Sequence, residues 1–342
     1  MSRERHPPSI WLYAFGYFAC YAPYSALTKL VSQGRLPGMP RALDGFEMLP
    51  ITTAASLVGM IVFLTAKGWW KHATHRQIFG VRVPTPTRWT FLSGVATAAI
   101  IGMTTLAYTF EGTSIVFMML LMRGGVLVLA PVVDALSKRK VAWFSWVALG
   151  LSLAALLVAI TDGASYAMTA VAAIDVAVYL GGYFVRLRFM SHLAKSDDPA
   201  LGARYFVEEQ MVATPAIVLL LAITALVGSG PIPHAVRAGF TEIGSSGAVL
   251  PGLVIGLLSQ GTGITGALIL LDKRENAFCV PVNRASSVLA GVLASGTLAA
   301  LGFSRRVPGS ELAGAALVLL AIGFLSWPTI SAARRGGAGR GS

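Results

Sequence analysis

The sequence predicts an all-α integral membrane protein with ten transmembrane helices, arranged as two inverted five-helix repeats. Three observations lead to this fold class. Of the 342 residues, 55% are hydrophobic and only 12% are charged, whereas a soluble domain carries about 25% charged residues. Apolar runs long enough to cross a bilayer recur along the whole chain. Finally, the two halves of the chain share a set of residues at one offset near half its length.

Each apolar run is predicted to form one membrane-spanning helix. A helix rises about 1.5 Å per residue and the hydrocarbon core is about 30 Å thick, so runs of this length suffice. Backbone polar groups cannot stay unpaired in lipid, which favours helices. The predicted spans are residues 9–31, 47–66, 89–110, 114–136, 142–161, 167–189, 206–228, 248–271, 276–302 and 310–331. The first repeat covers 1–163 and the second 164–342, with a basic tail at about 334–342 that we expect to be disordered.

The basic residues predict the orientation of these helices. With the N-terminus in the cytoplasm, and with residues near the end of a span counted on the adjoining segment, 19 of the 27 lysine and arginine residues fall on cytoplasmic segments, 6 on outer segments and 2 deep inside spans. Loops rich in lysine and arginine stay in the cytoplasm. The sequence therefore predicts a multi-pass plasma-membrane protein with both termini inside. The net charge of +12 is explained in this way, and we expect no nucleic-acid partner.

The remaining metal and disulfide candidates are weak. The longest loop, 67–88, contains His72 and His75, but no cysteine or carboxylate lies beside them, so a solvated loop is expected. Cys20 and Cys279 both lie in apolar runs and are expected to be small core residues. No metal and no cofactor are predicted.

An internal repeat links the two halves. A shift of 162 positions places Tyr17 and Tyr21 on Tyr179 and Tyr183. A shift of 161 positions matches four further pairs: Thr104 with Thr265, Glu111 with Asp272, Phe117 with Phe278, and Arg123 with Arg284. Five spans per half is an odd number, so the second half would enter the membrane from the opposite side. Such inverted repeats are typical of secondary transporters, which bind substrate near the midplane where the repeats meet.

These features resemble a known superfamily. The 5+5 arrangement, the short acidic hairpins before spans 4 and 9, and the small residues in those spans are similar to the drug/metabolite transporters, with EamA-type exporters the nearest bacterial group. The stretch Thr113–Gly125 also resembles the fourth helix of nucleotide-sugar and chloroquine-resistance-type transporters. Span 9 reads Val282-Asn283-Arg284-Ala285 and lacks the Gly-Ala-Leu-Asn-Lys motif of GDP-mannose carriers. The resemblance implies export of a small metabolite across a bacterial inner membrane.

Arg123 and Arg284 are the strongest candidates for substrate binding. Each lies well inside its predicted span, and inverted repeats would bring them to the midplane from opposite faces. An arginine at this depth is costly and should face a cavity or a partner. A guanidinium suits the carboxylate or phosphate of an anionic substrate because its planar donors match those oxygens. The alternative is a structural ion pair, for which Asp175 is the best partner, with Glu208, Glu209 and Asp134 as weaker ones.

Several polar side chains are candidates to join this site. Tyr17 and Tyr21 share one face of span 1, as Tyr179 and Tyr183 do on span 6, and each pair could line a cavity or pack helices. Gln260 and Asn283 could add hydrogen bonds to the substrate. Asp175 is the one carboxylate expected deep inside a span, so it could couple transport to protons. All these residues are candidates for the substrate site or for proton coupling.

The sequence thus favours a secondary transporter of a small polar, anionic metabolite that works by alternating access. An enzyme is not expected, since no His-Glu-x-x-His motif, no Gly-x-Ser-x-Gly motif and no pair of carboxylates within a span is present. Two alternatives stay open: a flippase for a phosphate-bearing lipid carrier, and a non-transporting partner subunit. The expected partners are a small-molecule substrate and the lipid bilayer, for a protein that is a monomer or a homodimer.

Overall fold

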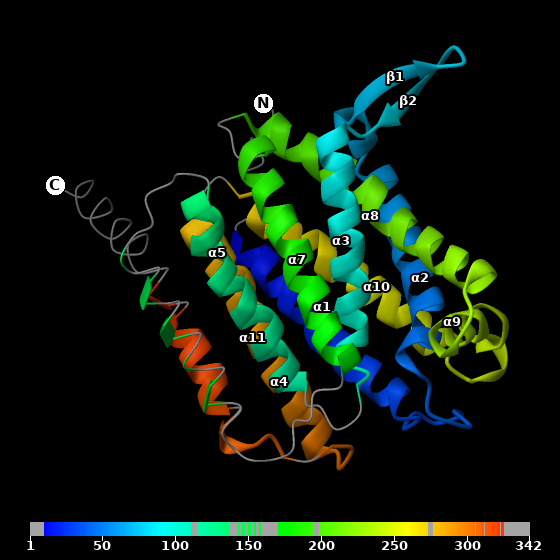
Figure 1. Ribbon diagram of the computed structural model, residues 1–342, viewed down its shortest axis with the longest axis vertical. Coiled ribbons are helices and arrows are strands. Elements are labelled where there is room, and N and C mark those ends of the chain that lie inside the picture. The colour runs from blue at the N-terminus through cyan, green and yellow to red at the C-terminus, as the bar shows by residue number, and fades with distance from the viewer. Residues whose placement is uncertain are drawn as a thin grey trace, which may run out of the picture.

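The computed structural model is a bundle of closely packed helices with one small β-hairpin (Figure 1). The structure describes residues 10–110, 115–136, eight positions between 143 and 158, 170–194, 198–272, 276–304, 306–310, 312–321, 323 and 324. Most of the predicted span 142–161, the end of the predicted span 310–331 and the predicted tail 334–342 therefore lie outside the described residues.

The described part of the first half contains four long helical segments. They are α1 (Ile10–Ser32), α2 (Gly45–Ala66), α3 (Arg88–Leu106), and a continuous helix made of α4 (Ile115–Met119), the π-helical turn η2 (Leu120–Gly124) and α5 (Gly125–Leu136). A short 3-10 turn, η1 (Trp69–His72), follows α2. α1, α2 and α3 begin and end within four residues of their predicted spans.

The described part of the second half also consists of helices. Its helices are α7 (Ala170–Leu193), α8 (Pro199–Val227), α9 (Pro231–Thr241), α10 (Val249–Leu270) and α11 (Asn276–Ala300), and residues 312–321 are also helical. A 3-10 turn, η3 (Ile243–Ser245), precedes α10. α8 begins seven residues before the predicted start, because Asp198 caps it and Pro199 occupies its first turn.

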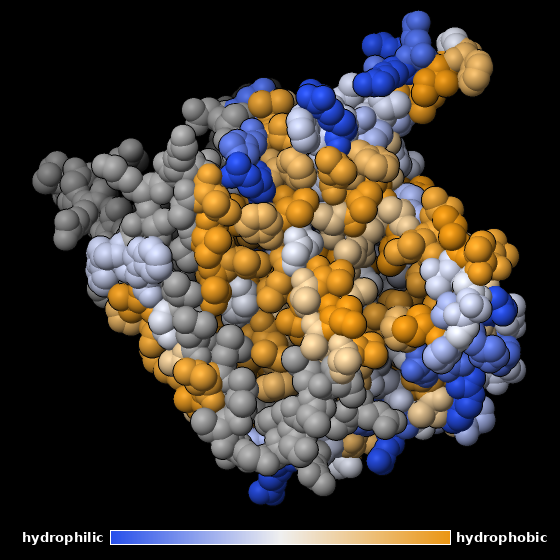
Figure 2. All heavy atoms as spheres, viewed as in Figure 1, coloured by the Kyte–Doolittle hydropathy of each residue, from blue (hydrophilic) through white to orange (hydrophobic). Residues whose placement is uncertain are grey.

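The helices are suited to a membrane. Five described helices, α2, α3, α7, α8 and α10, are long and apolar enough to cross one. Large apolar side chains such as Leu219, Leu226 and Leu257 are exposed on their outer surfaces. Figure 2 shows apolar residues over the flank of the bundle and hydrophilic residues at the hairpin and around α9. The all-α membrane class is thereby confirmed at this level.

Helices from the two halves interleave. α1 packs on α10 and α11, and α7 packs on α3 and α5, while α2 packs on α10 and α8 on α3. The α2–α10 contact requires glycine, since a Cβ at Gly256 would collide with the backbone oxygen of Thr52 and with Ala55. Small residues at such crossings let membrane helices approach closely.

The sequence predicted a solvated loop between α2 and α3, but this segment also contains regular structure. It forms an antiparallel hairpin of β1 (Thr74–Ile78) and β2 (Val81–Thr85), which projects from one end of the bundle (Figure 1). Its turn, Phe79-Gly80, has positive φ at both positions, as tight two-residue hairpin turns require. Glu208 of α8 anchors the base of the hairpin: it accepts hydrogen bonds from Thr74 N at 3.0 Å and Thr87 N at 3.2 Å.

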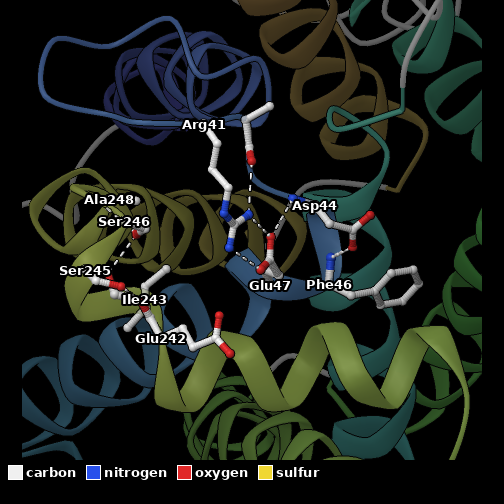
Figure 3. Close-up of polar contacts among 10 residues, drawn as sticks. Arg41, Asp44, Phe46, Glu47, Glu242, Ile243, Ser245, Ser246 and Ala248 are labelled. Carbon is white, nitrogen blue, oxygen red and sulfur yellow. Dashed lines mark hydrogen bonds and ion pairs between the residues drawn. The ribbon is translucent and has the colours of Figure 1, made fainter.

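The start of α2 is fixed by a capping box (Figure 3). The side chain of Asp44 accepts from Phe46 N at 2.7 Å, and the side chain of Glu47 accepts from Asp44 N at 3.1 Å. Arg41 adds two hydrogen bonds of 2.7 Å to the Glu47 carboxylate. The nearby α9 was not predicted; it packs on α2 and α8, and its Arg237 donates to Ala225 O at the end of α8 at 2.9 Å.

Candidate functional site

Arg123 lies in the π-helical turn η2 and is almost completely buried. Its Nη1 donates to the hydroxyl of Tyr179 on α7, and its Nη2 donates to the hydroxyl of Tyr21 on α1. Its Cζ lies 5.1 Å and 5.2 Å from the centroids of those two rings. The guanidinium is thus held between one tyrosine from each half. Single π turns inside α-helices are frequent at functional sites.

Arg284 on α11 reaches the same place from the other half. It is fully buried, its Nη1 donates to Tyr179 Oη at 3.5 Å, and its Cζ lies 4.5 Å above the Tyr183 ring. The hydroxyl of Tyr179 therefore accepts hydrogen bonds from both arginines. The structure brings the two predicted arginines together at one tyrosine.

The predicted tyrosines form one cluster around these cations. Tyr17 stacks on Tyr21 with ring centroids 5.2 Å apart, and Tyr179 lies 4.8 Å from Tyr183. Tyr21 Oη lies 2.5 Å from the hydroxyl of Tyr108, just after α3. Tyrosine hydroxyls that accept from an arginine orient their aromatic rings around the positive charge. The cluster fixes the arginines without neutralising them.

Next to the cluster is a cavity of about 70 Å³. It is lined by residues of α1, α2, α3, η2, α7, α8, α10 and α11, so both halves contribute. The predicted site residues that line it are Tyr17, Tyr21, Arg123, Tyr183, Gln260 and Asn283. Tyr179 and Arg284 are not among its lining residues, but they contact Arg123 and Tyr183, which are. The volume is sufficient for several water molecules, and the wall is rich in hydroxyl, amide and guanidinium groups.

Gln260 connects the two halves across this cavity. Its Oε1 accepts from Ser56 Oγ of α2 at 2.9 Å, and its Nε2 lies 3.3 Å from Gln210 Oε1 of α8. Asn283 donates from its Nδ2 to Gly266 O at 3.5 Å, while its Oδ1 is buried and has no hydrogen-bond partner in the part of the chain that the structure describes. An unpaired amide oxygen beside a cavity is free to accept a hydrogen bond from a bound molecule or water.

The charges at this site are not balanced. Within the part of the chain that the structure describes, no carboxylate forms an ion pair with Arg123 or Arg284. Three of their nitrogen atoms are buried and have no hydrogen-bond partner among the described residues: Arg123 Nε, Arg284 Nε and Arg284 Nη2. Buried cations of this kind are expensive unless they are paired. The arrangement can therefore bind a negatively charged group of a small molecule.

The ion pair with Asp175 that the sequence suggested is not formed. Asp175 is buried on α7, and neither of its carboxylate oxygens has a hydrogen-bond partner among the described residues. Glu208 and Glu209 are paired with Arg204 and Arg186 instead. The side chain of Asp134 lies outside the described residues. The sequence places Asp175 inside a span, but burial alone does not specify which side chains of neighbouring helices face one another.

Sequence reasoning missed a second buried polar cluster. Glu209 accepts two hydrogen bonds from Arg186 at 2.9 Å and 2.8 Å, and further ones from three hydroxyl groups. Those hydroxyls belong to Ser93, Thr97 and Tyr205, at 2.9, 3.0 and 3.2 Å. The predicted orientation counts Arg186, near the end of the span 167–189, with a cytoplasmic segment, but the structure buries it in α7, where it lines the cavity. The sequence does contain a sign of this cluster, because Arg186 and Glu209 lie within two consecutive apolar runs, 167–189 and 206–228.

The two histidines considered in the sequence lie in the segment between α2 and α3. His72 lies in η1 and His75 in β1, and no group of three or more histidine, cysteine, aspartate or glutamate side chains in the described residues could hold a metal ion.

Comparison with known proteins adds information on the fold. No known protein family matches the chain, and no curated protein matches it either. A solved structure described as "Crystal structure of protein" is similar, with a TM-score of 0.51 and 14% sequence identity over 95% of this chain and 98% of that chain. At this identity the similarity shows a shared overall fold, over nearly the full length of both chains.

Proposed function

We propose that the chain is a secondary transporter that carries a small anionic metabolite across the membrane by alternating access. The observation that carries the proposal is the pair of buried cations Arg123 and Arg284 beside a polar cavity. Some of their donors have no hydrogen-bond partner, and no carboxylate of the described residues forms an ion pair with them. An anion with a carboxylate or phosphate group would fill those donors bidentately.

The helix packing supports the inverted repeat on which this mechanism depends. If α1, α2, α3, α4/α5 of the first half are exchanged with α7, α8, α10, α11 of the second, three major contacts between the halves become other observed contacts. The α1–α10 contact corresponds to α7–α3, the α10–α2 contact to α3–α8, and the α1–α11 contact to α7–α5. Arg123 over the Tyr21 ring likewise corresponds to Arg284 over the Tyr183 ring. Ten spans in two inverted sets of five would account for these pairs.

Alternating access requires the two halves to move against each other around a fixed site. The cavity is lined by both halves, and Arg123 is held by one tyrosine from each. A rocking movement would therefore change the surroundings of the arginines directly. Following the family resemblance, we place the protein in a bacterial inner membrane with both termini in the cytoplasm, as an EamA-like exporter.

The proposal is tested by a thermal-shift screen of the purified protein in detergent. The panel contains amino acids, inorganic phosphate, sugar phosphates, nucleotide sugars and polyprenyl phosphates. A ligand that binds only the folded state raises the melting temperature. We expect an anionic class to stabilise the wild type and not the Arg123→Gln variant, while Arg41→Gln, which changes a surface arginine, behaves like the wild type.

Each outcome of the screen has a meaning. Stabilisation by a polyprenyl phosphate alone would indicate a lipid-carrier flippase in place of a metabolite carrier. Stabilisation by neutral compounds that persists in Arg123→Gln would contradict an anion site at the arginines. Stabilisation by no member of the panel would favour a partner subunit that does not transport.

A further inference from the structure

Two side-chain atoms in the wall of the cavity are buried and lack a hydrogen-bond partner among the described residues. One is Nε of Arg123, a donor from the first half, and the other is Oδ1 of Asn283, an acceptor from the second half. Asn283 is only 2% exposed. Buried polar atoms of native proteins almost always have a partner. A molecule that pairs with both atoms must therefore offer an acceptor to the arginine and a donor to the amide.

The orientation of the Asn283 amide follows from its surroundings. Its Nδ2 donates to the backbone oxygen of Gly266 at 3.5 Å, whereas a turned amide would bring two acceptor oxygens together. Oδ1 is therefore the atom left for a ligand, and an amide oxygen accepts hydrogen bonds without donating any. Gln260 shows the contrast within the same wall, because its Oε1 already accepts from Ser56 Oγ at 2.9 Å.

Asn283 and Arg123 belong to one continuous group of side chains. A Cβ at Gly266 would lie 2.7 Å from Cε2 of Tyr17 and 3.2 Å from Nδ2 of Asn283, so glycine keeps the space between those two side chains open. Tyr17 stacks on Tyr21, whose hydroxyl accepts from Arg123. The two tyrosines, the arginine and the asparagine all line the same cavity of about 70 Å³. Because the cavity is this small, one ligand can contact both unpaired atoms.

The wall of the cavity carries positive charge and offers no carboxylate. Arg123 and Arg186 line it, and none of the described lining residues is an aspartate or a glutamate. Asp175 and Glu209 lie outside the lining, and Glu209 already accepts from Arg186 and from three hydroxyl groups. An ammonium group on the ligand would therefore lie near arginines with no carboxylate to offset the repulsion. A neutral hydroxyl donates to Asn283 Oδ1 without that cost.

We propose that the site takes a hydroxylated anion, either a hydroxy acid or the phosphate ester of a polyol, and discriminates against amino acids. This rests on the proposed function and names the substrate class of the same site. The carboxylate or phosphate binds at Arg123, and a hydroxyl of the ligand donates to Asn283 Oδ1. Asn283 is thus the residue that distinguishes a hydroxyl from a hydrogen or an ammonium group on the ligand.

Two matched sets of ligands test the proposal on the purified protein. Each set keeps the anion and changes one substituent: propionate, lactate and alanine among carboxylates, and ethyl phosphate, 2-hydroxyethyl phosphate and 2-aminoethyl phosphate among phosphates. Dissociation constants are measured by calorimetry in detergent. We expect the hydroxyl compound to bind about tenfold more tightly than the unsubstituted one, as one hydrogen bond to a buried acceptor predicts. The ammonium compound should bind most weakly, and the set with the tighter hydroxyl ligand identifies the anion as carboxylate or phosphate.

Asn283→Leu tests the residue that recognises the hydroxyl. The variant has no acceptor at this position, so it should bind the hydroxyl and the unsubstituted compounds equally tightly. Asn283→Ala replaces it if the leucine variant does not fold. The control is Thr297→Val, at an exposed position of the same helix where the threonine hydroxyl donates to Leu293 O at 2.8 Å. This variant should keep the preference for the hydroxyl compound.

The outcomes separate this proposal from the proposed function. An ammonium compound that binds as tightly as its hydroxyl counterpart would overturn the hydroxylated class and retain the anion site. Equal binding of hydroxyl and unsubstituted compounds would do the same, because water would then satisfy Asn283 Oδ1 as well as a ligand does. A hydroxyl preference that persists in a folded Asn283 variant would also overturn the proposal. Binding of none of these compounds would contradict the anion site and, with it, the proposed function.

Discussion

Two buried polar clusters lie along the same face of α7, and they differ in how completely their charges are satisfied. At one, Arg186 and Glu209 form an ion pair whose carboxylate also accepts from Ser93, Thr97 and Tyr205. At the other, Arg123 and Arg284 share the Tyr179 hydroxyl, and three of their nitrogen donors have no partner among the described residues. The first cluster holds α3, α7 and α8 together. In the second, no carboxylate of the described residues forms an ion pair with either arginine.

The difference separates structure from function within one membrane core. A buried cation that has its carboxylate is part of the scaffold, because removing either partner strands the other. Buried cations with unfilled donors beside a cavity are poised to bind. Substitutions in the two clusters should therefore have opposite consequences for stability and for ligand binding.

The largest effect is expected for Glu209→Gln. The substitution leaves Arg186 buried without its counter-charge, which should cost about 3–5 kcal/mol of folding free energy. We expect a strongly lowered melting temperature in detergent and little folded protein. A variant that melts like the wild type would show that Arg186 finds another partner and that the first cluster is not a scaffold.

Arg123→Gln should give the reverse pattern. It removes a charge that has no carboxylate partner among the described residues, so folding should be affected less than in Glu209→Gln. The loss of a charged contact should weaken anion binding by about 2–5 kcal/mol, which ligand-dependent melting would detect. If Arg123→Gln instead loses its fold while anion binding per folded molecule is unchanged, both clusters are structural.

Tyr179→Phe tests the element that connects the two arginines. The variant removes a hydroxyl that accepts from both cations, and a hydrogen bond to a charged group contributes about 1.5–3 kcal/mol. Tyr24→Phe is the matched comparison, because Tyr24 is also buried and its hydroxyl lies 2.9 Å from the neutral Thr105 hydroxyl. Melting curves should show a larger loss for Tyr179→Phe. Equal losses would mean that Tyr179 contributes mainly packing.

The smallest effect is expected at the ion pair between the half-exposed Arg41 and the buried Glu47 (Figure 3). The hydrogen bonds to Glu47 raise the pKa of Arg41, so its charge is present at every ordinary pH. Arg41→Gln should still lower stability by only about 0–1 kcal/mol, because solvent reaches the Arg41 guanidinium and screens the pair. A melting temperature as low as that of Glu209→Gln would show that solvent exposure does not determine how much these two ion pairs contribute to stability.

Much of the helical framework could be predicted from the sequence, because apolar run length determines where a membrane helix begins and ends. The faces of α1 and α7 also followed from tyrosine spacing alone. The convergence of Arg123 and Arg284 was predicted from the offset between the halves. These features depend on local periodicity or on a repeat, both of which are visible in one sequence.

Features that depend on contacts between distant residues were not predicted. The hairpin is held at Glu208, more than a hundred residues away in the chain, and the Glu209 network joins α3 to α8. The assignment of Asp175 as a partner for arginine was wrong for the same reason, since run length does not specify how adjacent helices are rotated. The π turn at Arg123 has no signature in the residue pattern.

The proposal of anion transport is tested most directly by counterflow in proteoliposomes. Vesicles are loaded with the anion that stabilises the purified protein best, and uptake of the same radiolabelled anion is followed for the wild type, Arg123→Gln, Arg284→Gln and Arg41→Gln. We expect uptake by the wild type and Arg41→Gln, and none above empty vesicles for the two site variants. Equal uptake by all four proteins would contradict a transport site built on the two buried arginines.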